Sequence, residues 1–133
     1  MSMLRNFLEE KTNAYELVRR KRHKRELLQA WSIQFGATGL NGNDRFSSFK
    51  TGLSTHNRAQ GKHALRVFGT TRLRKFNLLI FGALYRITPL KDTTAHDFAN
   101  FILADNPEMI AWDDDCEWCL FLHHEGEIMF AYK

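Results

Sequence analysis

FNLLIFGALYRI, at residues 76–87, is the stretch of sequence that decides the fold. Apolar side chains occupy both alternating sets of positions, with Phe76, Leu78, Ile80 and Leu84 on one face and Leu79, Phe81, Tyr85 and Ile87 on the other. A strand that is apolar on both faces is covered on both sides, so these residues predict one strand at the centre of a sheet. Gly82 within the run indicates a bulge or the close approach of another backbone.

The segment after this central strand predicts a short helix and then a β-hairpin. Thr94 has the side chain of a helix N-cap, and Pro107 marks where that helix should end. Residues 116–124 and 127–132 read as strands that flank Glu125-Gly126, a pair that favours a two-residue turn with positive φ. We therefore expect a C-terminal hairpin.

The N-terminal residues 2–30 favour helix. Their apolar side chains recur at spacings of three and four, at Leu4, Phe7, Leu8, Ala14, Tyr15 and Val18. Asn13 and Glu16 have the spacing of a capping box, so the segment forms either one helix or two helices broken near Thr12. Residues 31–35 alternate in polarity and predict a short strand or the end of this helix.

The middle of the chain carries weaker signals. Residues 36–61 are rich in Gly, Ser, Thr and Asn, which is typical of loops, with a brief strand expected at residues 45–50. Residues 57–62 indicate a turn. Residues 63–68 predict another strand, because apolar and polar side chains alternate there.

Length and composition favour one domain. The 133 residues are 44% hydrophobic and include eleven Phe and three Trp, enough for one well-buried core. We expect residues 1–30 to form a basic helical segment and residues 31–133 a sheet-containing body. The predicted fold class is α+β, with an N-terminal helix or two, a mainly antiparallel sheet, one short helix after the central strand and the C-terminal hairpin.

Cellular location is predicted from what the residues lack. The longest uncharged apolar stretch, residues 76–85, is shorter than the roughly 20 residues that a membrane span needs. The first six residues contain no apolar block of the kind found in a signal peptide. Cys116 and Cys119 are too few for a disulfide framework. We expect a cytoplasmic protein without a membrane partner.

Charge is sorted along the chain. Up to Lys75 there are sixteen Lys and Arg against five Asp and Glu, whereas from Phe76 onward there are three against ten. The densest segment is RRKRHKR at residues 19–25, here called the basic run. On a helix these seven residues surround the whole circumference, so some face solvent or a partner. Such a field attracts polyanions.

The favoured hypothesis is nucleic-acid binding, to RNA or DNA, through phosphate contacts of the basic run. The residues expected to carry it are Arg19, Arg20, Lys21, Arg22, Lys24 and Arg25. A second basic group joins them if the fold places it alongside, namely Arg72, Arg74 and Lys75. Aromatic rings between cations are typical of proteins that stack single-stranded bases, and the rings here are Phe46, Phe49, Phe68 and Phe76.

Two alternatives use the same charges differently. The basic run forms a solvated face whose charges pair with the acidic C-terminal part, or it binds an acidic protein surface. In the second case the chain is a small inhibitor or adaptor, of a kind that suits a virus or mobile element. Self-association into a homo-oligomer would set the basic part of one copy against the acidic part of another.

An enzyme is the third class. The acidic triplet Asp113-Asp114-Asp115 could bind Mg²⁺, and His123 could move a proton in a metal-dependent nuclease. Adjacent Asp side chains in an extended turn point in different directions, which weakens this hypothesis. The Cys116–Cys119 pair has no matching second pair for zinc, so we expect buried free thiols. We assign no catalytic residue, metal or cofactor.

Overall fold

The computed structural model describes residues 3–36, 49, 56–105, 107–123 and 126–133. Its strands are β1 (Thr12–Leu17), β2 (Asn57–Gln60), β3 (Phe76–Ile80), β4 (Ala83–Pro89), β5 (Met109–Asp113), β6 (Trp118–Leu122) and β7 (Ile128–Tyr132). The longer helices of the described residues are α1 (Met3–Glu10), α2 (Lys21–Phe35), α4 (Gly61–Phe68) and α5 (Ala95–Asp105). One seven-stranded sheet runs in the order β1-β4-β3-β5-β6-β7-β2, with every neighbouring pair antiparallel. The predicted α+β class with an antiparallel sheet is confirmed.

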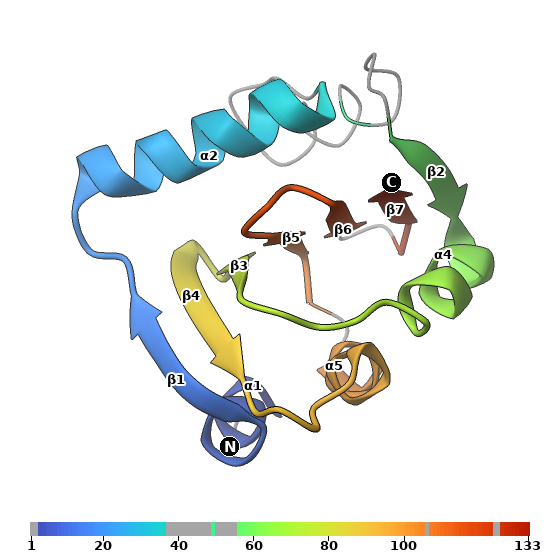
Figure 1. The fold of residues 1–133 in the computed structure, drawn as a ribbon, viewed down its shortest axis with the longest axis horizontal. Helices are drawn as coiled ribbons and strands as arrows, with labels where there is room; N and C mark the ends of the chain where they lie inside the picture. The colour runs from blue at the N-terminus through green and yellow to red at the C-terminus, as the bar shows by residue number, and fades with distance from the viewer. Residues whose placement is uncertain (1–2, 37–48, 50–55, 106, 124–125) are drawn as a thin grey trace.

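Helices cover both faces of the sheet (Figure 1). On one face α1, α4 and α5 pack over a cluster that includes Phe7, Phe68 and Phe98. On the other face α2 packs through Trp31 and Phe35 over a second, aromatic-rich cluster. The sheet is therefore the middle of three layers, and α2 is the long helix of its own layer (Figure 1).

The stretch at residues 76–87 forms a hairpin rather than one strand. Strands β3 and β4 pair with Ile80 opposite Ala83, so Phe81 and Gly82 make a two-residue turn. Their φ values are 52° and 75°, and two positive φ values are what the favoured tight hairpin turn requires. The prediction of a continuous strand with a bulge at Gly82 was wrong, because both arms are apolar on both faces and no change of pattern marks the turn. The predicted faces beyond the turn were wrong as well: Leu84 packs with Leu79 toward α2, and Tyr85 and Ile87 pack with Phe76 and Leu78 on the other face. The central position of β3, between β4 and β5, is confirmed.

The N-terminal segment contains two helices with a strand between them. Helix α1 ends at Glu10, and β1 then pairs with β4 at the edge of the sheet. Asn13 and Glu16 therefore lie on a strand and form no capping box. Residues 31–35 are the last turns of α2, as one of the two alternatives predicted. Pairing with β4 gives β1 backbone hydrogen-bond partners along one side, and this tertiary pairing overrides a helical sequence pattern.

Two predictions in the middle of the chain were also wrong. Residues 63–68 belong to helix α4, because Ala64 and Phe68 are buried four residues apart on one face of a helix. Residues 57–60, expected in a turn, form the edge strand β2, which pairs with β7. The strand expected at residues 45–50 lies outside the described residues except for Phe49.

The helix cap and the hairpin that the local sequence predicts in the C-terminal half are both present. Thr94 caps α5: its Oγ1 accepts from the Asp97 backbone N–H (3.2 Å), and its own N–H donates to Asp97 Oδ2 (2.9 Å). The predicted hairpin is confirmed as β6 and β7. The strands end at Leu122 and begin again at Ile128, so the connection is longer than two residues. Glu125 of the predicted turn lies outside the described residues.

Candidate nucleic-acid interface

The basic run lies between β1 and the first turns of α2. Val18, just before it, donates its backbone N–H to Leu84 O (2.8 Å) and buries its side chain under α2. This anchor holds the run at the end of the sheet where the β3–β4 turn lies. The residues exposed there are Arg19, Arg20, Lys21, Arg22 and Arg25, whereas Lys24 is half-buried.

The start of α2 is electrostatically unusual. Arg20 occupies the N-cap position with extended φ and ψ, and its side chain makes no cap hydrogen bond. The first turn contains no acidic residue. Helix N-termini carry partial positive charge from unpaired amides, and here cationic side chains add to that charge. An anion at this end would be stabilised by both contributions.

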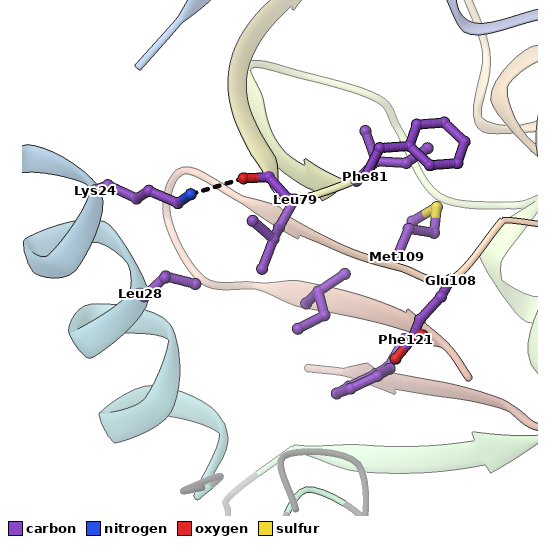
Figure 2. Close-up of a pocket in the computed structure, with 10 residues that line it drawn as sticks. Lys24, Leu28, Leu79, Phe81, Glu108, Met109 and Phe121 are labelled. Atoms are coloured by element: carbon purple, nitrogen blue, oxygen red, sulfur yellow. Dashed lines mark hydrogen bonds between the residues drawn. The ribbon is translucent and has the colours of Figure 1, made fainter. Parts of the chain in front are cut away.

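Acidic side chains do little to neutralise the basic run. Arg22 pairs with Glu26 (3.2 Å), but these side chains are 91% and 60% exposed, so the pair is worth little. Lys24 donates from Nζ to the carbonyl of Gly82 (2.8 Å), which carries no formal charge (Figure 2). Within the described part of the chain, no acidic side chain lies in salt-bridge range of Arg19, Arg20, Lys21 or Arg25.

The acidic triplet lies away from the basic run and makes its contacts there. Arg86 on β4 donates from Nη2 to both carboxylate oxygens of Asp114 (2.8 and 2.9 Å). Asp113 is buried at the end of β5, and this burial raises the pKa of its carboxyl. Asp115 is exposed. Over the ranges that the structure describes, no three His, Cys, Asp or Glu side chains are grouped to hold a metal ion.

The second basic group does not join the basic run. Arg72, Arg74 and Lys75 are exposed and lead into the first residue of β3, whereas Lys24 contacts the turn after its last residue. The groups are therefore separated by the length of β3, roughly 16 Å at the usual rise per residue. Lys75 instead adjoins the acidic triplet, because its carbonyl accepts from the backbone N–H of Asp114 (3.1 Å).

The aromatic residues predicted to stack bases are not available for it. Phe49, Phe68 and Phe76 are fully buried in the two core clusters, so that prediction was wrong, and Phe46 lies outside the described residues. The most exposed aromatic ring among the described residues is that of Phe81, which was predicted to lie inside a central strand. Phe81 is 68% exposed and precedes Gly82, the residue to which Lys24 bonds. The signal that could have revealed it is a Phe-Gly pair at the tip of a hairpin.

A cavity opens beside the basic run, between α2 and the sheet. Its volume is about 440 Å³. Lys24 and Leu28 line it from α2 and face Leu79 and Phe121 of the sheet, whereas Phe81 lines its far end with the ring pointing away from α2 (Figure 2). Apolar side chains dominate its lining, and Glu108 is the acidic residue among them. The cavity, the exposed ring and the cationic helix end thus share one edge of the molecule.

The two cysteines form no disulfide; Cys119 is buried and Cys116 is half-buried. Cys119 is buried on β6, where its Sγ accepts from Trp31 Nε1 (2.9 Å), and burial raises the pKa of its thiol. Burial also raises the pKa of the Cys116 thiol, which lies in the turn before β6. A nucleophilic or redox-active cysteine needs a lowered pKa, so this geometry favours packing.

Comparison with protein-family models, curated proteins and solved structures finds no match for this chain. None of the helices in the described ranges is long and apolar enough to cross a membrane.

Proposed function

We propose that this protein is a non-enzymatic nucleic-acid-binding protein that docks phosphates against the start of α2. The observation that carries the proposal is a cluster of cations at an uncapped helix N-terminus, of which Arg19, Arg20, Lys21 and Arg25 have no acidic side chain of the described residues in salt-bridge range. The contacting residues are Arg19, Arg20, Lys21, Arg22, Lys24 and Arg25. Free thiols suit a reducing compartment, so we propose that binding takes place in the cytoplasm.

The mechanism is electrostatic docking. Arginine forks and the amides of the first helical turn bind phosphate oxygens, and the counterions released from the nucleic acid drive association. The second basic group, Arg72, Arg74 and Lys75, can contact the same nucleic-acid strand only if the nucleic acid extends along the whole length of β3. The neighbouring acidic triplet also offsets the positive field of this second group, so the group contributes less to the affinity for nucleic acid.

The test compares two variants with the same change in charge. Arg20→Glu, Arg22→Glu and Arg25→Glu together reverse three cations of the basic run; Arg72→Glu, Arg74→Glu and Lys75→Glu reverse three cations at the other end of β3. Fluorescence anisotropy with a labelled oligonucleotide at low and at physiological salt gives the affinities. We expect the first variant to lose at least about tenfold more affinity than the second at each salt concentration.

Equal losses in the two variants, or affinity insensitive to salt, would contradict the proposal. A melting curve by circular dichroism checks that the first variant still folds, since the Arg22→Glu substitution places a carboxylate four residues before Glu26, which repels it.

An acidic protein surface is the alternative partner for the same cations. It is supported if the wild-type protein binds no nucleic acid at low salt. Analytical ultracentrifugation at low and high salt then identifies self-association, which would give a mass above that of the monomer that decreases as salt is added.

A further inference from the structure

Phe81 breaks two local preferences at once. Its ring is 68% exposed, and its backbone has a φ of 52°. Positive φ is costly for a bulky side chain, and Asn is the residue usually favoured at this position of a two-residue hairpin turn. Residues that violate local rules without a packing reason cluster at functional sites. The ring therefore calls for a role outside the core.

The cavity next to Phe81 has the size and lining for a flat apolar group. Its volume of about 440 Å³ falls within the range of small-ligand pockets. Leu28, Leu79 and Phe121 line it from three different elements, α2, β3 and β6 (Figure 2). A planar ring that enters it removes apolar surface from water, whichever base it belongs to.

Lys24 connects this cavity to the basic run. Its ammonium group gives one hydrogen bond to Gly82 O and has further donors for an anion. It lines the cavity and also belongs to the first turns of α2. A phosphate bound at the helix end would therefore lie close to the β3–β4 turn that carries Phe81.

Resting on the proposed function, we infer that the nucleic acid recognised is single-stranded, with one unpaired base stacked on Phe81 and inserted into the cavity while its flanking phosphates contact the basic run. A duplex keeps its bases paired and stacked, so it reaches the cations but not the cavity. The apolar lining offers few groups for reading base edges, so binding tolerates many sequences.

The experiment measures anisotropy with a labelled single strand of about 12 nucleotides and with its duplex, at one salt concentration. Phe81→Asn removes the ring and suits the positive φ, so it is expected to fold at least as well as the wild type. Its affinity for the single strand should fall by about tenfold, with no change for the duplex. The dependence of the affinity on salt should also be unchanged, because no cation is lost.

Two further variants make the result specific. Phe81→Trp keeps a stacking ring and should retain the wild-type affinity, with its fluorescence quenched by the single strand but not by the duplex. Leu28→Trp fills the cavity and should weaken single-strand binding while duplex binding is kept. Melting curves establish that each variant folds.

The outcomes separate this inference from the proposed function. Equal affinity for single strand and duplex, with no effect of Phe81→Asn, overturns the inference and leaves nucleic-acid binding in place. A loss of affinity for both the single strand and the duplex in Phe81→Asn also overturns it, because the ring would then support binding by the basic run and would not stack on an unpaired base. If the wild type binds neither probe, the proposed function itself fails.

Discussion

Two non-glycine residues in the described part of the chain adopt positive φ, and they do so for different reasons. Cys116 lies half-buried before β6, where its carbonyl is hydrogen-bonded to His56 Nε2 (2.8 Å). Tertiary contact thus holds its backbone. Phe81 is largely exposed, so the closing of the β3–β4 hairpin sets its conformation. A bulky side chain at this positive-φ position is unfavourable for stability.

Substitutions in this turn should change stability in opposite directions. Phe81→Asn should raise the free energy of unfolding by about 0.5–1 kcal/mol, because Asn tolerates positive φ. Gly82→Ala should lower it by about 1 kcal/mol or more. A Cβ at Gly82 meets no atom within 4 Å, so its φ of 75° is the sole source of that cost. Urea denaturation measures both; a destabilised Phe81→Asn would show that ring packing outweighs backbone strain.

The α5 cap makes stability depend on pH. The backbone N–H of Thr94 lowers the pKa of the Asp97 carboxyl by hydrogen-bonding to its charged form. Because the folded-state pKa is below the unfolded one, the bond stabilises the fold above about pH 4 and its contribution is lost as pH falls through the folded-state pKa. Asp97→Asn should therefore cost about 0.5–1 kcal/mol at neutral pH and progressively less in acid.

Urea denaturation of Asp97→Asn across this pH range is the measurement. Asp92→Asn, at an exposed position of the preceding turn, removes the same charge and serves as the control. A deficit in Asp97→Asn that persists at about pH 2 would contradict the assignment to the carboxylate.

At the scale of elements, α2 divides into a packing half and an exposed half. Trp31 and Phe35 in its C-terminal half are fully buried, and Trp31 donates to Cys119 Sγ on β6. In its N-terminal half, Leu27 and Leu28 are only partly buried. The packed half fixes the direction of the helix, which leaves the cationic turns free to face a partner.

The uncapped start of α2 predicts a conflict between stability and binding. Arg20→Asp adds an N-cap acceptor and a negative charge at the positive end of the helix dipole, so it should stabilise the fold by about 1 kcal/mol. The same substitution should lower affinity for the oligonucleotide, because it reverses a cation of the interface. Thermal denaturation and anisotropy measure the two effects.

Arg72→Asp is the matched control for this change in charge. Position 72 is exposed and precedes β3 without capping a helix, so its substitution should leave stability within about 0.5 kcal/mol of the wild type. If Arg20→Asp gives no more stability than this control, the prediction is wrong and the backbone amides at the N-terminus of α2 already have hydrogen-bond partners.

At the scale of the whole molecule, the acidic triplet is kept apart from the basic run. The basic run lies at the turn end of β3, and the acidic triplet lies at the opposite end, where Asp113 pairs in register with Phe76. Asp114 is bound to Arg86 on β4 rather than to α2. The fold thus keeps the acidic triplet from neutralising the basic run and sets it beside the second basic group, while Glu108 lines the cavity that Lys24 also lines.

This separation predicts how strongly salt weakens binding. If the six cations of the basic run are the phosphate contacts, the slope of log affinity against log salt for a single strand should be no steeper than about −4. Anisotropy titrations over a range of potassium chloride concentrations give this slope. A value near zero would exclude phosphate docking, and one well beyond −4 would show that the second basic group also contacts the strand.

Local chemistry predicted part of the fold well. The Thr94 cap and the β6–β7 hairpin were found because the groups that form them are close in sequence, as was the amphipathic stripe of α1. Strand β1 was missed because its backbone bonds belong to β4, which lies far later in the chain. The β3–β4 hairpin was missed because no Asn or Asp marked its turn.

The candidate interface, like the fold, could be predicted from the sequence only in part. The expectation of a polyanionic partner rests on composition, since seven consecutive residues of cationic type or histidine create an attractive field for polyanions in any arrangement. Which of those cations act together depends on distances between segments that chain position does not encode. Pairing of β1 with β4 brought the start of α2 to the β3–β4 turn, and the same sheet carried Arg72, Arg74 and Lys75 to its other end. Strand pairing over long sequence separations thus placed Phe81, the cavity and Lys24 together.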